Sequence, residues 1–342
     1  MINSGKDQIT TTKQQHSVLI TGGAGYIGSH LTLLLRKQGY QVIVIDNLST
    51  GNAWSVPEDC LITGDILDTD TLINIMREQQ FQTVVHLAAK SSVPESFDKP
   101  DDYFENNVNG TKSVIEACAS AGIQQLLFSS TAAVYGNATH GIVKENAPLN
   151  PISPYGKSKL EAEQVVKILC ALYGIKQITF RYFNVIGAHP KALIGQYNPG
   201  SGHLLQKCLD CVQKSTPLQI YGNDYDTVDG TAERDYIHVQ DLASLHLHAM
   251  RYLDRDGKSQ LLNAGYGTSH SVLEFIQTFQ KIANKTISSR YVSRREGDPI
   301  SLIADPSRLD ALLDWQPQFS SLEQMIGSSW LWEISAKRRS IA

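Results

Sequence analysis

The sequence has no long apolar run and no block of basic residues. None of its hydrophobic stretches approaches the roughly 20 residues that a membrane-spanning helix needs. With 30 Lys and Arg against 34 Asp and Glu, the formal net charge is -4, which argues against a nucleic-acid partner. We therefore expect neither a membrane nor a nucleic acid as partner, and the ordinary composition favours an enzyme with a small-molecule substrate.

Cysteine is also scarce. Five cysteines, an odd number spread over 342 residues, do not suggest a disulfide framework and fit a reducing, cytoplasmic location. Cys208 and Cys211 fall in a predicted helix with no second pair of ligands nearby, so we expect no metal site. Residues 1–16 are polar and lack the apolar core of a secretion signal, and we predict a flexible leader there.

The first half of the sequence alternates short apolar runs with amphipathic stretches. This alternation is typical of an α/β fold with a Rossmann-type, doubly wound parallel sheet. Beyond Gly187 the rhythm changes, so we predict a first domain at 17–186 and a smaller α/β lobe at 187–342, with some segments returning to the first domain. The predicted strands of the first domain are 17–21, 41–46, 60–63, 83–88, 125–129 and 176–182, and one continuous helix is predicted over 102–120.

A glycine-rich turn joins the first strand to the first helix. Gly22, Gly25 and Gly28 have the spacing of a dinucleotide fingerprint, in which missing Cβ atoms let the backbone turn tightly and approach a pyrophosphate. The helix N-terminus would supply N–H groups for the phosphates. The second strand ends at Asp46, whose carboxylate can bind a ribose 2′-hydroxyl and would repel a 2′-phosphate. Residues 17–186 are therefore predicted to bind NAD rather than NADP.

A hydroxyl, a phenol and an ammonium follow the fifth strand. Thr131 lies where that strand ends, on the edge at which open α/β sheets bind ligands. Tyr155 and Lys159 are four residues apart in a predicted helix and so share one face. We predict that Tyr155 takes a substrate hydroxyl proton, Thr131 holds the oxygen, and Lys159 lowers the Tyr155 pKa and holds the nicotinamide ribose.

From about Ser17 to Trp332 the chain resembles the extended short-chain dehydrogenases/reductases, and within them the UDP-glucose (UDP-galactose) 4-epimerases. The resemblance implies a homodimeric enzyme in which NAD takes hydride from C4 of a UDP-hexose and returns it to the other face. The matching stretches include Thr21–His30, Asn106–Thr111, Ser153–Lys159, Arg181–Pro190, Tyr221–Tyr225, Arg234–Val239 and 294–298.

The resemblance also implies further site residues. Guanidinium groups suit a diphosphate, and carboxylates suit ribose hydroxyls. The residues implied for the NAD site are Tyr26, Ile27, Asp46, Asn47, Asp65, Ile66, Lys90, Asn107, Tyr155 and Lys159. Those implied for the UDP-sugar are Thr131, Tyr155, Asn184, Tyr221, Arg234, Arg295, Asp298 and Leu302.

Two positions depart from the family pattern. Thr131 stands where Ser is more usual, and its hydroxyl can make the same hydrogen bond. Leu302 stands where, by the resemblance, a strict glucose/galactose epimerase carries a Tyr. The shorter Leu side chain would leave room for an N-acetyl group at C2 of the sugar. We hypothesise that UDP-N-acetylhexosamines are used as well as UDP-hexoses.

Several alternatives remain open. A dedicated UDP-N-acetylglucosamine 4-epimerase and a UDP-pentose 4-epimerase would need no new catalytic group. A 4,6-dehydratase is disfavoured, because Ala132 and Ala133 stand where such enzymes carry an Asp-Glu pair. From another class, a non-catalytic NAD-sensing regulator would not need to keep Tyr155, Lys159 and Thr131 together.

Overall fold

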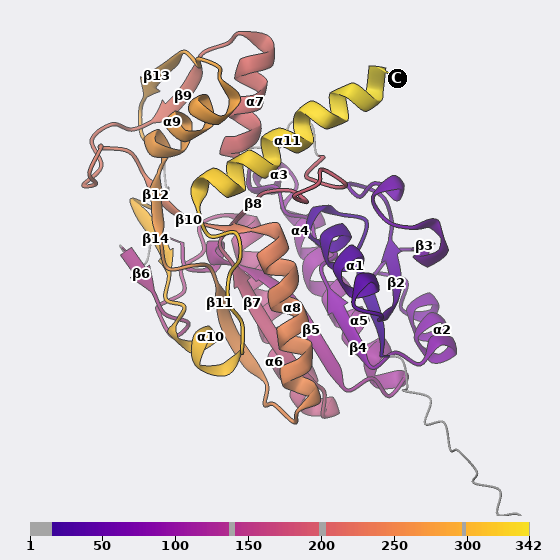
Figure 1. Ribbon diagram of the computed structural model, residues 1–342. Coiled ribbons are helices and arrows are strands. Elements are labelled where there is room, and N and C mark those ends of the chain that lie inside the picture. Colours follow the sequence, from indigo (N-terminus) through magenta and orange to yellow (C-terminus); the bar gives the residue numbers. More distant parts are fainter. Residues whose placement is uncertain (1–15, 137–140, 198–202, 296–298, 342) are drawn as a thin grey trace, which may run out of the picture.

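The structure, a computed structural model, describes residues 16–136, 141–197, 203–295 and 299–341 (Figure 1). A seven-stranded sheet forms its larger half, and every strand pair in it is parallel. The strand order is β11-β7-β5-β4-β1-β2-β3. Successive strands are therefore added on one side of β1 up to β3 and on its other side from β4 onward. These strands are β1 (Ser17–Thr21), β2 (Gln41–Asp46), β3 (Leu61–Thr63), β4 (Thr83–His86), β5 (Gln125–Thr131), β7 (Lys176–Tyr182) and β11 (Gln260–Ala264).

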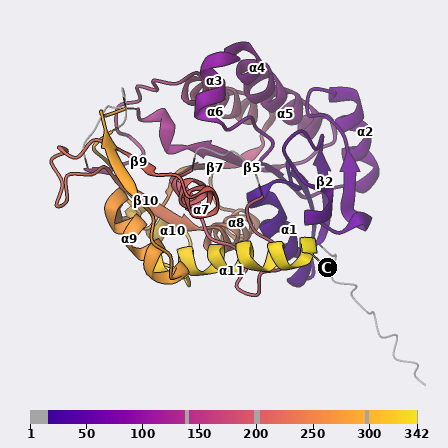
Figure 2. The same cartoon turned by 90° about the horizontal axis from the view of Figure 1, so that it is seen from above.

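Helices cover both faces of this sheet, which confirms the predicted doubly wound fold (Figure 2). Val18 and Ile20 of β1 pack in one core with α1 and α8, whereas Leu19 packs in the other with α2, α5 and α6. The alternation follows because successive side chains of a strand point to opposite faces. These helices are α1 (Tyr26–Lys37), α2 (Thr69–Gln79), α5 (Gly110–Ser120), α6 (Pro154–Tyr173) and α8 (Val239–Asp254).

The smaller half contains a mixed sheet of order β12-β10-β14-β6, with β8 also paired to β10, and a separate pair, β13-β9. The last helix, α11 (Leu322–Ile341), runs from this half across to the side of α1 (Figures 1 and 2). The other elements after β5 are β6 (Gly141–Val143), β8 (Asn184–Ile186), α7 (Leu204–Lys214), β9 (Leu218–Tyr221), β10 (Glu233–His238), β12 (Ser269–Ser271), α9 (Val272–Ala283), β13 (Ser289–Val292), β14 (Ser301–Ala304) and α10 (Ser307–Leu312).

One predicted helix is interrupted. The sequence favoured a continuous helix over 102–120, but the chain forms α4 (Pro100–Phe104), a π-helical turn (Glu105–Asn109) and then α5, preceded by the short α3 (Val93–Asp98). Such π turns often mark functional sites, because they redirect a side chain without ending the helix. Here the turn contains Asn107, whose buried amide is described below.

β10 was not predicted, because its first three residues, Glu233, Arg234 and Asp235, are all charged. Its buried Asp235 explains how such a strand is tolerated. The Asp235 carboxylate accepts hydrogen bonds from the backbone N–H groups of Tyr266 (3.0 Å), Gly267 (2.9 Å) and Ala304 (3.1 Å). A buried carboxylate that is satisfied in this way joins three segments rather than disrupting the core.

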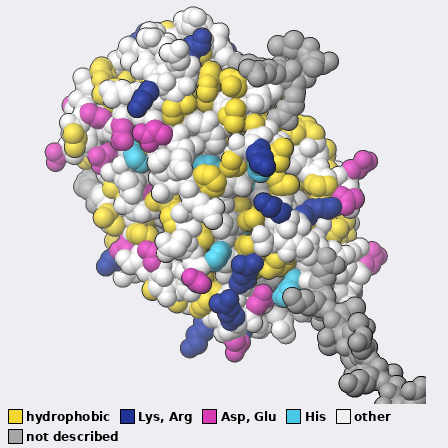
Figure 3. Space-filling view, viewed as in Figure 1, with side chains coloured by type: hydrophobic (Ala, Val, Ile, Leu, Met, Phe, Trp, Pro, Cys, Tyr) yellow, Lys and Arg dark blue, Asp and Glu magenta, His cyan; other side chains and the backbone are white. Residues whose placement is uncertain are grey.

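Charges of both signs are interspersed with apolar side chains on the face shown in Figure 3, without a broad area of one sign. Within the described part of the chain, no helix is both long and apolar enough to cross a membrane. The same residues contain no cluster of three or more His, Cys, Asp or Glu side chains placed to hold a metal ion.

Candidate active site

The glycine turn between β1 and α1 forms a cradle of backbone. Gly22 has φ +71°, and a Cβ on it would lie 2.6 Å from the backbone nitrogen of Ala88. A Cβ on Gly28 would collide with the carbonyl oxygen of Gly22. Gly25 is the N-cap of α1, and no side-chain hydrogen bond caps this helix end. The geometry fits a pyrophosphate held by the first N–H groups of α1, as a bound NAD requires.

Asp46 lies at the end of β2 beside this turn. Its Oδ2 accepts from the backbone N–H of Ala24 (3.0 Å), and its Oδ1 accepts from that of Leu48 (2.8 Å). Burial raises the pKa of Asp46, and these two hydrogen bonds oppose the rise. A Cβ on Gly51 would lie 2.7 Å from Oδ1, so Gly51, which the sequence reasoning missed, keeps the space beside the carboxylate free. Each oxygen retains a lone pair for a ribose hydroxyl.

The ends of β2 and β3 are tied together by predicted cofactor residues. Asn47 Nδ2 donates to Asp65 Oδ2 (2.9 Å), and the other Asp65 oxygen accepts from the backbone N–H of Leu67 (2.9 Å). Ile66 is buried in the core beneath α5. These residues form the edge of the sheet where an adenine would lie.

The start of α1 contacts the smaller half. The Tyr26 hydroxyl donates to the carbonyl oxygen of Gly187 (2.5 Å), and its ring lies edge-on to His30 at 5.4 Å. Burial raises the pKa of Tyr26 well above its usual range. Ile27 packs against the first core. The phenol of Tyr26 therefore acts as a neutral hydrogen-bond donor that links the two halves.

Asn107 in the π turn shapes the loop after β4. Its Oδ1 accepts from the backbone N–H of Lys90 (2.9 Å), while its Nδ2 donates to the Lys90 carbonyl (3.0 Å) and to Ser158 Oγ (3.0 Å). Lys90 Nζ lies 3.7 Å from a carboxylate oxygen of Asp102. The amide of Asn107 is thus engaged by protein groups and positions the Lys90 backbone.

Thr131, Tyr155 and Lys159 are brought together at the carboxyl end of β5 and the start of α6. The Thr131 hydroxyl accepts from the backbone N–H of Ala133 (3.1 Å) and hydrogen bonds to Tyr155. Ser153 caps α6 by accepting from Gly156 N (3.0 Å), which fixes where the helix begins.

The electrostatics of this set differ from expectation. Burial raises the pKa of Tyr155, and the hydrogen bond to Thr131 opposes the rise. Burial lowers the pKa of Lys159 to about 7, and the charge of Glu163 opposes that fall. Lys159 Nζ lies 4.4 Å from the Phe128 ring centroid. Burial therefore decides the direction of the Tyr155 shift, and the lowering of its pKa that we expected from Lys159 is not found.

A buried ion pair lies one helical turn beyond Lys159, and the sequence reasoning missed it. Glu163 accepts from Arg181 Nε (2.9 Å) and Nη2 (2.7 Å), and from Ser130 Oγ (2.5 Å). The two charged side chains are 7% and 2% exposed. Ser130 of β5 and Arg181 of β7 are paired residues, and both donate hydrogen bonds to Glu163. Glu163 therefore joins β5 and β7 through a clamp of side-chain contacts just before Thr131. The four-residue spacing of Tyr155, Lys159 and Glu163 on α6 was the available signal.

Three predicted substrate residues meet through β10. Asn184 of β8 lies opposite Tyr236 of β10, and Arg234 of β10 lies opposite Leu302 of β14. Arg234 Nη1 donates to the carbonyl oxygens of Glu233 (2.6 Å) and Pro299 (2.9 Å). Leu302 packs in an apolar cluster with Ala132, Val134, Tyr135, Val143, Phe183 and Ala304, of which Ala132 directly follows Thr131 in sequence.

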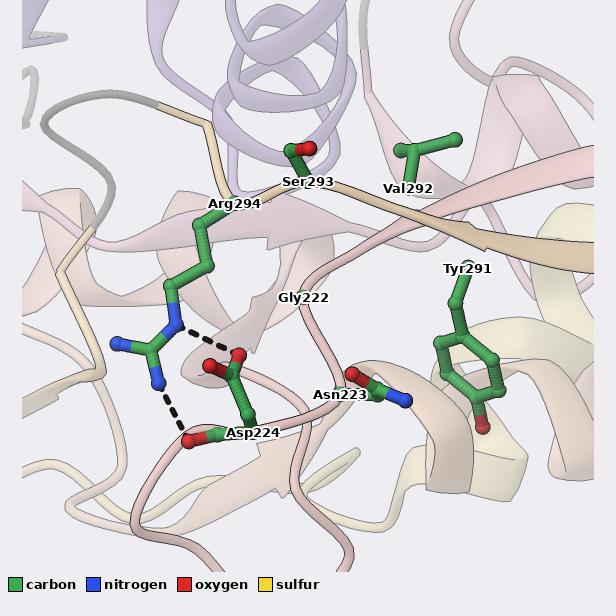
Figure 4. A pocket seen from close by; sticks show the side chains of 7 residues that line it. All are labelled: Gly222, Asn223, Asp224, Tyr291, Val292, Ser293 and Arg294. Carbon is green, nitrogen blue, oxygen red and sulfur yellow. Dashed lines mark hydrogen bonds and ion pairs between the residues drawn. The ribbon is translucent and has the colours of Figure 1, made fainter.

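Tyr221 and Arg295 form a second group at the β9–β13 pair. The Arg295 guanidinium lies 4.3 Å from the Tyr221 ring centroid, a cation–π contact. Beside them a hollow of about 610 Å³ opens between the loop after β9 and the end of β13, with Arg294 Nε 2.7 Å from Asp224 Oδ1 (Figure 4). Asp298 lies outside the described residues. Cys208 and Cys211 are buried, unpaired thiols in α7.

Comparison with known proteins agrees with this geometry. The model of the NAD dependent epimerase/dehydratase family matches residues 18–265. The UDP-glucose 4-epimerase of Azospirillum brasilense is 42% identical over 323 residues, which cover 94% of this chain and 93% of that protein.

Two solved structures are similar over almost their whole length. A UDP-glucose 4-epimerase from Stenotrophomonas maltophila, with bound NAD and formylated UDP-arabinopyranose, has TM-score 0.91 and 38% identity, covering 95% of this chain and 100% of that one. The UDP-Glc/GlcNAc 4-epimerase of Campylobacter jejuni has TM-score 0.83 and 38% identity, covering 94% and 99%. The parallel sheet, glycine turn and matches together show that the chain belongs to the NAD dependent epimerase/dehydratase family, among the UDP-glucose 4-epimerases.

Proposed function

We propose that the protein interconverts UDP-glucose and UDP-galactose by transient oxidation at C4, with NAD held at the glycine turn and Asp46. The observation that carries this proposal is the convergence of Thr131, Tyr155 and Lys159 at the carboxyl end of β5, on the same sheet edge as the glycine turn. We assign cofactor binding to residues 17–186 and substrate binding mainly to 187–342, with β11 and α8 returning to the large sheet.

Tyr155 is the group we assign to proton transfer. A bound NAD would supply the hydride acceptor for C4 of the hexose and the hydride donor for the opposite face of the keto sugar. Tyr155 takes the C4 hydroxyl proton and gives it back, while Thr131 holds the same oxygen. Burial raises the pKa of Tyr155, so it needs a nearby positive charge to act as a base, and Lys159 supplies part of that charge.

We propose that the protein binds its substrate mainly through the UDP moiety and holds the sugar only loosely. Arg234 and Arg295 offer guanidinium groups for a diphosphate. Asn184 lies on β8 beside β10, the strand of Arg234, and the Tyr221 ring contacts the Arg295 guanidinium. An anchored UDP with a loosely held hexose allows the keto sugar to present either face. On the resemblance alone, we propose Asp298 as a partner of the UDP ribose hydroxyls.

UDP-N-acetylhexosamines are a second proposed substrate class. The presence of Leu at position 302 in place of a larger Tyr supports this proposal. The branched aliphatic side chain of Leu302 packs in the apolar cluster with Ala132, whereas a Tyr at this position would reach further because a phenol replaces the isopropyl group. The Campylobacter jejuni relative is named for both glucose and N-acetylglucosamine substrates. Leu302→Tyr should lower turnover of UDP-N-acetylgalactosamine more than that of UDP-galactose; equal loss of both would contradict a role in selectivity.

Incubation of the purified protein with UDP-galactose tests the main proposal. We expect UDP-glucose to accumulate to a constant ratio without net NADH formation. A panel with UDP-N-acetylgalactosamine and UDP-arabinose distinguishes the dedicated N-acetylglucosamine and pentose alternatives. Protein that retains NAD yet converts none of these sugars would instead support the non-catalytic regulator.

We further propose a cytoplasmic homodimer that pairs through the outer faces of α5 and α6. The five cysteines are all unpaired, which suits a reducing compartment. Ile168 and Leu172 lie one turn apart on α6 and are 63% and 69% exposed, more than apolar side chains of a monomer usually need to be. Light scattering of the purified protein should give twice the 37.8 kDa chain mass.

A further inference from the structure

Two stacked tryptophans join the cofactor half to α11. The rings of Trp54 and Trp332 are 6.0 Å apart with an interplanar angle of 20°. Trp54 lies in the loop between β2 and β3, within a short 3-10 helix (Ala53–Ser55), and is 54% exposed. Trp332 lies in α11 and is 5% exposed. The two partners therefore differ: Trp332 is enclosed by the protein, whereas more than half of the Trp54 side chain faces solvent.

Trp332 is held by the segment that follows β8. Its Nε1 donates to the carbonyl oxygen of Gln196 (3.0 Å), and a Cβ on Gly195 would lie 2.5 Å from its ring. Tyr197 continues this segment and meets Trp54 edge-on at 5.7 Å and 81°. Trp54 thus contacts two aromatic rings that both belong to the substrate half.

The loop that carries Trp54 also forms the outer wall of the proposed dinucleotide site. The carbonyl oxygen of Ala24, in the glycine turn, accepts from the backbone N–H of Asn52 (2.9 Å) and from Ser55 Oγ (2.9 Å). Gly51 packs directly against the Asp46 carboxylate. A movement of Trp54 away from Trp332 would pull on the same few residues that flank the glycine turn and Asp46.

We propose that Trp54 is a latch that retains bound NAD, with the buried Trp332 as its fixed partner and Tyr197 as a second aromatic contact. The proposal rests on the proposed function, because a cycle of oxidation and re-reduction has to keep one cofactor from start to finish. Escape of the cofactor between the two steps would strand a keto sugar. Stacking across the two halves opposes that escape without any contact to the sugar.

NAD release from the holoprotein measures the latch directly. The protein purified with NAD is diluted into buffer that contains an excess of a second, NAD-consuming dehydrogenase as a trap, and the release rate is recorded without any sugar nucleotide. We expect Trp54→Ala to release NAD about tenfold faster than the native chain, as the loss of one stacked and one edge-on aromatic contact implies. Trp54→Phe should restore most of the native rate.

Matched variants separate a latch from general loss of stability. Trp330 lies on the same helix and packs edge-on against Phe279 at 5.9 Å, away from the loop, so Trp330→Ala should leave release unchanged. The double variant of Trp54→Ala with Trp332→Ala should release NAD no faster than the faster single variant. An unchanged rate in Trp54→Ala, or an equal acceleration in Trp330→Ala, overturns the proposal. Because no sugar is present, failure of epimerisation leaves this readout unaffected.

Discussion

The cofactor half and the substrate half differ in how far apart in the sequence their neighbouring strands lie. In the large sheet, β1 to β5 and β7 follow one another between Ser17 and Tyr182, and their site residues lie at or just after strand ends. In the smaller half, β6, β8, β10, β12 and β14 come from segments spread between Gly141 and Ala304. A site on consecutive strands can be read as short motifs, whereas a site built by distant pairing has no local pattern.

Arg234 and Leu302 illustrate the second case. They are far apart in sequence and become neighbours only because β10 pairs with β14. That pairing depends on Asp235, whose carboxylate binds the backbone of Tyr266, Gly267 and Ala304. Variants that act on one half alone therefore test whether the two halves have separate tasks.

Tyr155→Phe should have the largest effect and should act on chemistry alone. Removing the proton-transfer group is expected to lower kcat about 10²- to 10⁴-fold, with NAD content unchanged. Turnover with UDP-galactose and absorbance of the bound cofactor measure both. Tyr173→Phe, at the exposed far end of the same helix, is the control. Native turnover in Tyr155→Phe would remove this residue from the mechanism.

Glu163→Ala should destabilise the cofactor half strongly. It leaves Arg181 buried without its carboxylate, which costs about 3–5 kcal/mol of unfolding free energy. Urea unfolding followed by fluorescence measures the loss. Glu116→Ala, which breaks the solvent-facing Lys112–Glu116 pair on α5, should cost at most about 1 kcal/mol. Equal losses in the two variants would show that the Glu163 clamp contributes little.

Arg234→Ala should act on the substrate half alone. Loss of a charge-assisted contact is expected to raise KM for UDP-galactose about 10- to 100-fold without loss of bound NAD. Arg294→Ala is the matched control, because the Arg294 guanidinium is paired with Asp224. A fall in NAD content in place of a rise in KM would mean that the two halves are not separable.

The smallest expected effect concerns acid stability. Burial lowers the pKa of His86 to about 3, and the charge of Lys159 adds to the fall, so His86 stays neutral in the folded chain while the unfolded chain protonates it near pH 6.5. Stability from this group is present above pH 6.5 and is lost as pH falls toward 3. Between pH 7.5 and 5.5 the native chain should lose about 1.4 kcal/mol more than His86→Gln. Identical losses in urea titrations at the two pH values would contradict this.

The same contrast explains what the sequence allowed us to predict. Strands β1 to β5, the glycine turn and the Tyr155–Lys159 spacing are local, and the predictions made from them match the described fold. The π turn at Asn107 was missed because the apolar periodicity continues through it. Glu163 meets Ser130 and Arg181 only through packing of α6 on the β5–β7 pair, and Trp54 meets Trp332 only when α11 crosses between the halves. The Trp54–Trp332 contact has no sequence signal, and the spacing on α6 indicates only that Glu163 shares a face with Tyr155 and Lys159.

The central claim is that C4 loses hydride and regains the same hydride within one protein molecule. UDP-galactose carrying deuterium at C4 tests it in a single measurement, with the product examined by NMR. We predict UDP-glucose that retains deuterium at C4, in buffered ordinary water and without added cofactor. Product in which the C4 deuterium has been replaced by solvent hydrogen, or no product from protein that holds NAD, would contradict the account.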